Sequence, residues 1–381
     1  MSTEGGTRRL RVGILFGGRS GEHDVSLRSA QSVMAALDPA RYDVVPIGIG
    51  RDGSWVIDGD PMRALTDGSN VSSRATAILT NASQHGLVTI PVSTGESAID
   101  AQSPNTIAAA IDVVFPVMHG PYGEDGTIQG LLEIADVAYV GSGVLGSAVG
   151  MDKSIQKTLL RAAGIPVIDW ISFTANEWSR QQDRILVDVE VKLAYPCFVK
   201  PSNLGSSVGI SKASNESELI TGVELAASFD RRIVIEKSVL GFREIECSVL
   251  GNDSPDVSVP GEIVPDREWY DYDAKYSNSK TELIIPAQIP LETAREVRRL
   301  AAAAFAVLDC AGMARVDFFV SQDGSNVFVN EVNTIPGFTN ISMFPKLWEA
   351  TGMSYAALID RLIELAIERH RERSTMRTTQ K

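Results

Sequence analysis

One stretch of the chain, residues 314–337 (ARVDFFVSQDGSNVFVNEVNTIPG), limits the possible folds more than any other. Two runs rich in valine and phenylalanine flank the turn-forming sequence QDGS, which predicts a β-hairpin. Because side chains alternate across a strand, Arg315 and Asp317 share one face of the first arm. Glu331 and Asn333 share one face of the second arm, and the turn sets position 317 opposite 331 and 315 opposite 333. The hairpin therefore presents an arginine, two carboxylates and an amide on one face.

The opposite face of this hairpin is apolar and is predicted to face the core. It carries Val316, Phe318, Val320, Phe328 and Val332. On the polar face, two carboxylates about 4 Å apart repel by roughly 4 kcal/mol at an effective dielectric near 20, and one arginine neutralises only one of them. Such an oxygen-rich set suits Mg²⁺, which binds carboxylate and phosphate oxygens. The alternative is a hairpin at a sheet edge whose polar face is simply solvated.

Length, charge and cysteine content exclude several classes of protein. The 381 residues are enough for two or three domains, and a net charge of −13 argues against a general nucleic-acid or membrane-surface binder. No apolar run reaches about 18 residues, and no signal-peptide pattern precedes the first strand, so we expect a cytoplasmic protein. Cys197, Cys247 and Cys310 lie far apart in apolar segments, which predicts reduced, buried thiols.

A strand, a glycine-rich loop and a helix follow one another near the N-terminus. Residues 10–16 are apolar, the loop GGRSGEHD follows, and a helical pattern begins after it, as in the opening of a doubly wound α/β domain. A dinucleotide-binding fold is the rival interpretation, but the loop lacks G-x-G-x-x-G and places Glu22 and His23 where a pyrophosphate would approach. A second apolar strand, 111–118, ends at His119. We expect this first domain to end near residue 145.

Two lysines mark the centre of the chain. Lys153 begins a predicted helix, and Lys200 lies near the end of an apolar strand. The loop SNLGSSVGI, residues 202–210, leads from that strand into another one, so it is no Walker A loop, which needs a following helix and G-K-[ST]. Its backbone amides could still fold over phosphates, the alternative being an ordinary hairpin loop.

The last part of the chain alternates between irregular and helical patterns. Residues 265–276 are aromatic and charged with no clean period, which predicts a loop. A helical period follows at 292–308 and again at 354–367, and residues after His370 are expected to fray. Residues 51–108 are the least informative part.

Seven separate stretches, in the same order, resemble the D-alanine–D-alanine ligases, members of the ATP-grasp superfamily. Together they span residues 12 to about 345, whereas the terminal tails and residues 51–108 are unmatched. The stretches are Gly17-Gly18-x-Ser20-x-Glu22-x-Asp24-Val25-Ser26, His119-Gly120 with Gly123-Glu124-Asp125-Gly126, Met151-Asp152-Lys153, Lys200-Pro201 with Gly205-Ser206-Ser207-Val208-Gly209, Tyr270-Asp271-Tyr272-Asp273-Ala274-Lys275-Tyr276, Arg315-Val316-Asp317 and Glu331-Val332-Asn333-Thr334-Ile335-Pro336-Gly337.

The resemblance implies an ATP-grasp fold, α/β with α+β character in the C-terminal part, behind an N-terminal Rossmann-like pre-ATP-grasp domain. Residues 1–145 would bind the first D-alanine, residues 146–236 would carry the glycine-rich loop, and residues 237–381 would carry the metal site and a closing loop. ATP would lie between the second and third parts. The family is commonly dimeric and works in peptidoglycan precursor synthesis, which implies a cytoplasmic homodimer.

The resemblance also assigns nucleotide and metal contacts. An apparent extra residue before Glu244 leaves Arg243 or Glu246 as alternatives for the ribose contact. Two Mg²⁺ ions, for which Mn²⁺ may substitute, would be bound by Asp317, Glu331 and Asn333. The implied nucleotide-binding residues are Lys153, Lys200, Ser206, Ser207, Glu236, Lys237, Val239, Glu244, Lys275 and Asn330.

The reaction implied by the resemblance has two steps. The γ-phosphate of ATP would activate the first D-alanine as D-alanyl phosphate, and the amine of the second D-alanine would then attack it. Glu22 would hold the first ammonium group with His119 nearby, and Ser342 would bind the second carboxylate. Arg315 and the backbone N–H of Gly337 would stabilise the developing oxyanion.

The choice of acceptor depends on the aromatic loop. The resemblance implies that this loop closes and that its Tyr276 joins Ser206 and Glu22, while Lys275 reaches the γ-phosphate. Ligases that form D-alanyl-D-lactate depart from this tyrosine pattern, which the present chain keeps, so a second D-alanine is favoured. Two alternatives stay open: a ligase for D-lactate or another acceptor, and a nucleotide-binding regulatory protein that kept the fold without the chemistry.

Overall fold

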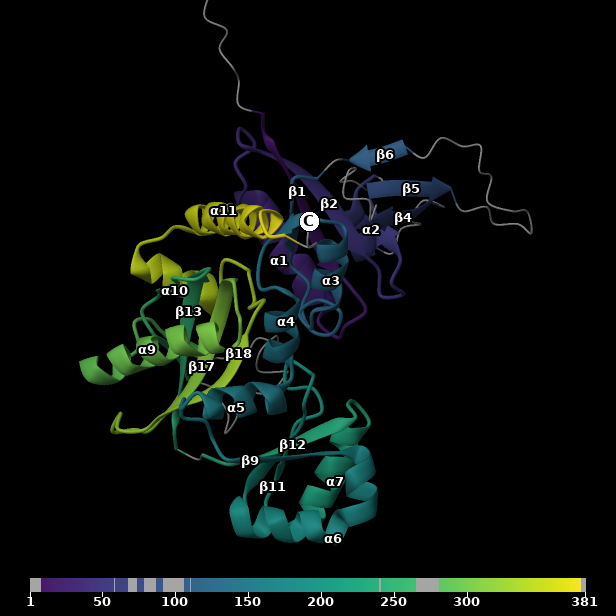
Figure 1. The fold of residues 1–381 in the computed structure, drawn as a ribbon. Helices are drawn as coiled ribbons and strands as arrows, with labels where there is room; N and C mark the ends of the chain where they lie inside the picture. Colours follow the sequence, from purple (N-terminus) through teal and green to yellow (C-terminus); the bar gives the residue numbers. More distant parts are fainter. Residues whose placement is uncertain are drawn as a thin grey trace, which may run out of the picture.

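Three lobes meet around one centre in the structure, which is a computed structural model (Figure 1). It describes residues 8–57, 59–67, 74–78, 87–91, 106–109, 111–239, 241–264 and 281–377. Each lobe is built on its own β-sheet, and the described strands form four sheets in all. No helix in the described ranges is long and apolar enough to cross a membrane.

The first lobe contains a five-stranded sheet in the order β3-β2-β1-β7-β8, parallel except for β3. Strand β1 has β2 on one side and β7 on the other. The chain therefore adds strands first towards one edge of the sheet and then towards the other, and the order reverses beside β1. Open α/β sheets bind ligands at such a switch point, beyond the carboxyl ends of the strands. The elements are β1 Leu10–Gly17, α1 His23–Ala36, β2 Tyr42–Ile49, β3 Trp55–Val56, α2 Pro61–Asp67, β7 Val113–Pro116, α3 Thr127–Ile134, β8 Ala138–Tyr139 and α4 Val144–Met151.

A small antiparallel sheet, β4-β5-β6, lies beside this lobe (Figure 1). Its strands belong to the stretch that the sequence left least defined. They are β4 Arg74–Ile78, β5 Leu87–Pro91 and β6 Thr106–Ala109.

The central lobe is a four-stranded antiparallel sheet, β11-β10-β12-β9, with α6 and α7 packed against it (Figure 1). Apolar side chains of the two helices and of β10 and β12 share one core, which leaves the other sheet face for the neighbouring parts of the chain. The elements are α5 Lys153–Ala162, β9 Trp170–Thr174, α6 Ala175–Lys192, β10 Cys197–Pro201, β11 Ser211–Ala213, α7 Glu216–Ala227 and β12 Arg232–Lys237.

The third lobe contains the sheet β16-β15-β13-β17-β18, with β14 paired to β13 and α9 covering one face. The predicted hairpin is the β17–β18 pair at one side of this sheet. The elements are β13 Arg243–Gly251, β14 Asp256–Val257, β15 Gly261–Val264, β16 Glu282–Ile284, α9 Leu291–Val307, β17 Gly312–Val320, β18 Val327–Asn333, α10 Met343–Thr351 and α11 Tyr355–Ser374.

The last helix, α11, ties the third lobe to the first. Its Leu358 and Leu362 are fully buried in a core shared with Val12 of β1 and Phe115 of β7. The expectation of fraying after His370 is wrong, because the helix continues to Ser374. The His370 ring nitrogen Nε2 lies 3.1 Å from a carboxylate oxygen of Asp136 in the first lobe, and this contact stabilises the last turns.

The expected elements otherwise agree closely with the observed ones. The predicted helix 292–308 is observed as Leu291–Val307, and the first strand as Leu10–Gly17. All three cysteines are buried and free, as expected, and burial raises the pKa of the Cys310 thiol to about 12. The domain boundaries at residues 145 and 236 stay predictions.

Candidate active site

A cavity of about 670 Å³ lies where the three lobes meet. Tyr276 and Lys275 lie outside the described residues. Every other residue that the sequence assigned to the site lines this cavity. These are Glu22, His119, Lys153, Lys200, Ser206, Ser207, Glu236, Lys237, Val239, Glu244, Arg315, Asp317, Asn330, Glu331, Asn333, Gly337 and Ser342.

One end of the cavity holds the buried carboxylate of Glu22 at the start of α1. The Ser206 hydroxyl of the glycine-rich loop donates a hydrogen bond to Glu22 Oε1. Two glycines leave room for this carboxylate: a Cβ atom on Gly120 would lie 2.6 Å from Glu22 Oε2, and one on Gly205 would lie 3.2 Å away. Gly120 also has a φ of +75°, which disfavours a side chain. The loops after β1, β7 and β10 therefore converge on one anionic group.

The ring of His119 is buried beside this carboxylate. Its Nδ1 lies 3.1 Å from the carbonyl oxygen of Ile335, and its Nε2 lies 3.2 Å from the Ser29 hydroxyl. Because a carbonyl only accepts, Nδ1 carries the proton and Nε2 accepts from Ser29. Burial lowers the pKa of His119, so the ring is neutral near pH 7. His119 thus joins the loop after β7 to the segment that leads to Gly337.

Glu124 is a cavity-lining carboxyl that the sequence quoted in a motif but did not single out. Its Oε1 accepts a 2.7 Å hydrogen bond from the Gly120 N–H. Burial and the nearby Glu22 carboxylate together raise the pKa of Glu124 to about 8. Glu124 is therefore largely protonated at neutral pH.

Glu124→Gln is expected to stabilise the protein at pH 8 but not at pH 4.5. The unfolded carboxyl ionises above about pH 4.3, whereas the folded one does so near pH 8. Wild-type stability therefore falls as pH rises between these values, and glutamine removes that loss. The check is the difference in Tm between variant and wild type at both pH values. A difference that does not change with pH would contradict it.

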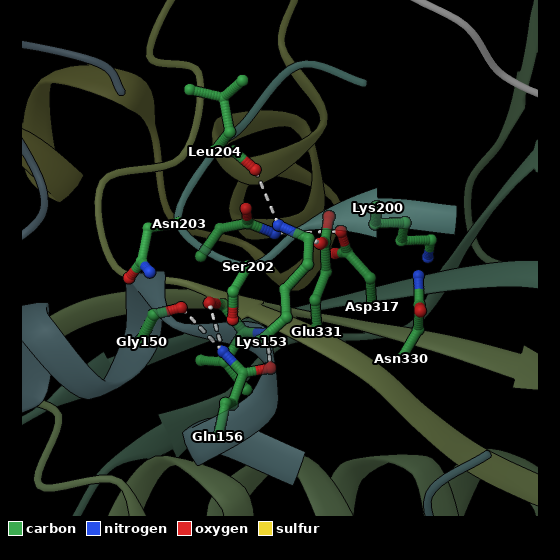
Figure 2. A network of polar contacts seen from close by, with 12 residues as sticks. Gly150, Lys153, Gln156, Lys200, Ser202, Asn203, Leu204, Asp317, Asn330 and Glu331 are labelled. Atoms are coloured by element: carbon green, nitrogen blue, oxygen red, sulfur yellow. Dashed lines mark hydrogen bonds and ion pairs between the residues drawn. The ribbon is translucent and has the colours of Figure 1, made fainter. Parts of the chain in front are cut away.

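Lys153 reaches across the cavity from the first turn of α5. Its Nζ donates to the Leu204 carbonyl at 2.8 Å and lies 3.6 Å from Glu331 Oε2. Figure 2 shows this side chain between the two acceptors. Asp152 caps the helix by accepting from the backbone N–H groups of Ser154 and Ile155, and this fixes the point from which Lys153 extends.

A second cationic group is centred on the buried carboxylate of Glu236 in β12. Lys200 Nζ donates to Glu236 Oε2 at 2.7 Å, and Lys157 Nζ lies 3.3 Å from Glu236 Oε1. Burial alone would raise the pKa of Glu236, but the two lysines outweigh it and lower the pKa to about 2. Lys157 was missed at the sequence level. Its signal was its position one helical turn after Lys153, on the same face of α5.

The strand β13 carries the three candidates for the ribose contact. Glu244 and Glu246 both line the cavity, and Glu246 Oε2 lies 3.0 Å from Arg315 Nε. The guanidinium of Arg243 forms two hydrogen bonds with Glu262, at 2.7 and 2.5 Å. The choice of Glu244 for the ribose contact stays a prediction.

The hairpin has the predicted register over its functional part. Arg315 pairs with Asn333 and Asp317 with Glu331. A bulge then shifts the register between Asp317 and Phe318. The bulge reverses which side chains of β18 face the core on the far side of it. The prediction that Phe328 faces the core is therefore wrong.

Val329 is fully buried in place of Phe328. Its backbone N–H donates to the Pro166 carbonyl at 2.9 Å. Phe328 instead lies with its ring centroid 6.0 Å from that of Phe242. Because a bulge adds one residue to one strand, Asn330 lines the cavity beside Glu331.

Arg315 is held in a fixed orientation by two carboxylates. Its Nε and Nη2 donate to the two carboxylate oxygens of Asp317, each at 2.7 Å. Although burial lowers the pKa of Arg315, Asp317 and Glu246 raise it well above its usual range. Asn333 Nδ2 also donates to Asp317, at 2.9 Å. The counter-ion interpretation of Arg315 is thus observed, and its action on an oxyanion stays a prediction.

The polar face of the hairpin suits a divalent cation that also binds phosphate. Within the described ranges, no three His, Cys, Asp or Glu side chains come close enough to hold a metal ion by themselves. Asp317 and Glu331 offer carboxylate oxygens and Asn333 an amide oxygen, which are hard ligands of the kind that Mg²⁺ binds. Because these protein ligands are few, phosphate oxygens would have to complete the coordination of the ion.

Another part of the cavity wall is formed by the N-terminus of α10. Ser342 is the N-cap residue, and its hydroxyl accepts from the Thr339 N–H at 3.1 Å. A Cβ atom on Gly337 would lie 3.2 Å from this hydroxyl. The free N–H groups and the dipole of a helix N-terminus favour a carboxylate. The cavity is therefore lined both by the Glu22 carboxylate and by a helix end at Ser342 that favours anions.

Two family models match the chain. Residues 11–142 match the N-terminus of the D-Ala–D-Ala ligases, and residues 159–364 match the C-terminus. A D-alanine–D-alanine ligase from Natranaerobius thermophilus is 47% identical over 96% of this chain and 97% of its own length. One from Geobacillus thermodenitrificans is 48% identical over 97% of this chain and 99% of its own length.

Solved structures agree with these matches. The VanG D-Ala:D-Ser ligase from Enterococcus faecalis has a TM-score of 0.81 at 34% identity and covers 94% of this chain and 100% of its own. The D-alanine–D-alanine ligase from Coxiella burnetii has a TM-score of 0.78 at 37% identity and covers 96% and 97%. The expected α/β ATP-grasp fold is confirmed. By sequence and by fold, the chain belongs to the D-alanine–D-alanine ligase family.

Proposed function

We propose that this protein uses ATP to join two D-alanine molecules into D-alanyl-D-alanine for peptidoglycan precursor synthesis. One observation supports the proposal: a single cavity is lined by the Glu22 carboxylate, by Lys153 and Lys200, by the polar face of the hairpin and by the N-terminal end of α10. Family membership and the names of the relatives support it. We further propose that it works in the cytoplasm as a homodimer.

In the first step, Glu22 holds the ammonium group of the first D-alanine. A carboxylate oxygen of this D-alanine then attacks the γ-phosphorus of ATP. The bond to the bridging oxygen breaks and ADP leaves. Lys153 and Lys200 stabilise the phosphate charge, and Glu236, Lys237, Val239, Glu244 and Asn330 surround the rest of the nucleotide. Asp317, Glu331 and Asn333 would hold two Mg²⁺ ions, or Mn²⁺, which would supply positive charge against the phosphate oxygens.

In the second step, the amine of the second D-alanine attacks the acyl carbon. Inorganic phosphate leaves as the C–O bond breaks, and the amine loses a proton. The Gly337 N–H and Arg315 stabilise the oxyanion. Ser342 and the N-terminus of α10 bind the carboxylate of the incoming D-alanine, so they set the position of its amine.

The expected acceptor is D-alanine. The preference of the enzyme for this acceptor is tested by measuring ADP release near neutral pH, with D-alanine alone and with added D-lactate or D-serine. Mass analysis then identifies the product. We expect the dipeptide of two D-alanines as the main product in every mixture. D-serine is included because the VanG structure is that of a D-Ala:D-Ser ligase. A dominant ester or seryl product would overturn the assignment of the acceptor, and no ADP release would overturn the ligase.

A further inference from the structure

Lys157, Glu236 and Lys200 form a buried cluster with two cations and one anion. The Glu236 carboxylate lies 2.7 Å from Lys200 Nζ and 3.3 Å from Lys157 Nζ, and its side chain is 4% exposed. The three side chains together carry one excess positive charge in a buried place where charge is costly. The nearby Glu331 carboxylate attracts both lysines and Glu244 attracts Lys200, so an anion that binds at Lys200 competes with these carboxylates.

The two lysines of the cluster differ in their access to the cavity. Lys200 and Glu236 line it. Lys157 is 1% exposed, and its Nζ also donates to the Asn330 carbonyl at 3.1 Å. This second hydrogen bond connects α5 to the strand β18. Lys157 is thus fixed behind the cavity wall, where a ligand meets Glu236 and Lys200 first.

We propose that Lys157 is a positioning residue that neutralises Glu236, so that the charge of Lys200 acts on the nucleotide phosphates. The proposal rests on the proposed function, because it takes the cavity to bind ATP. Lys157 would touch neither ATP nor D-alanine and would act through Glu236.

The physical reason is the charge that remains on Glu236 and Lys157 when a nucleotide phosphate binds the Lys200 ammonium in place of Glu236. With Lys157 present, Glu236 keeps a buried partner, and the remaining pair is neutral. Without Lys157, the same transfer leaves a buried carboxylate without a cation, which is strongly unfavourable. Lys200 would then stay with Glu236, since charge-assisted hydrogen bonds of this kind are the strong ones.

The test is the dissociation constant of ATP, measured by calorimetry with Mg²⁺ and without D-alanine. Lys157→Met should weaken ATP binding at least about tenfold, as expected for a lost charge-assisted hydrogen bond. The double variant Lys157→Met/Glu236→Gln should bind ATP about as tightly as Glu236→Gln alone, because a neutral glutamine releases Lys200. Lys192→Met, which removes an exposed lysine on α6, is the control and should bind ATP as wild type does.

A further variant keeps the test independent of the folding of Lys157→Met. Glu236→Gln alone is the reference for the double variant: adding Lys157→Met to it should change the dissociation constant of ATP by less than about twofold, because a neutral glutamine needs no second cation. The proposal is overturned if folded Lys157→Met binds ATP like wild type. It is also overturned if Lys157→Met weakens ATP binding as much in the Glu236→Gln background as in the wild type. Failure of the wild type itself to bind ATP would overturn the proposed function instead.

Discussion

Glu331→Gln is expected to lower kcat by about 10²–10³-fold, the loss typical when one electrostatic stabiliser of a transition state is removed. Glu331 lies opposite Asp317 in the hairpin and within 3.6 Å of Lys153. Glutamine keeps the shape of the side chain but loses the charge that a divalent cation and Lys153 require. The carboxylate is partly exposed, with 25% of its side chain accessible. The free energy of unfolding should therefore change by less than about 1 kcal/mol.

The measurement pairs ADP-release kinetics with denaturant unfolding of the same preparation. A metal role further predicts that the Mg²⁺ concentration for half-maximal activity rises in Glu331→Gln. Glu349→Gln removes an exposed charge on α10 and serves as the control, with both quantities near wild type. Parallel losses of turnover and stability in Glu331→Gln would instead assign this hairpin face a structural role.

The hairpin shows what sequence pattern determines and where it stops. Two-residue alternation and the QDGS turn were enough to pair Asp317 with Glu331, because both are local properties of the chain. They did not reveal the bulge that buries Val329 in place of Phe328. That bulge accompanies a hydrogen bond from Val329 to the carbonyl of Pro166, a residue distant in sequence. Alternation within one strand carries no information about such a partner.

Glu124 and Lys157 mark the second limit. The sequence shows that the first is a carboxylic acid and the second an amine. Their ionisation and pairing, however, depend on burial and on partners from other elements. Glu124 owes its raised pKa to desolvation and to Glu22, and Lys157 of α5 pairs with Glu236 of β12, which is distant in sequence. Sequence reasoning found the groups that the family motifs name. It missed Glu124 and Lys157, because the pKa shift of the one and the ion pair of the other arise only when the chain folds and buries them.

Arg315→Lys is expected to lower kcat by about 10²–10³-fold, the loss typical for one oxyanion donor, while leaving the KM for D-alanine little changed. Arg315 is held by paired hydrogen bonds to Asp317 and by Glu246, so its guanidinium is fixed on the cavity wall. Lysine keeps the charge that these carboxylates need but not the planar fork that orients the donors. The variant should therefore fold. Removing the charge altogether, as in Arg315→Met, should cost about 3–5 kcal/mol of stability.

Arg243→Lys separates the two roles of Arg315. Arg243 forms the same kind of paired contact with Glu262, and its side chain is similarly buried, at 15% exposed against 18% for Arg315. Both lysine variants should lose similar stability in denaturant unfolding, because both lose one bidentate pair. If kcat falls in Arg315→Lys alone, the loss belongs to the transition state. Equal kcat values for the two variants would restrict Arg315 to the role of counter-ion and leave the Gly337 N–H as the oxyanion donor.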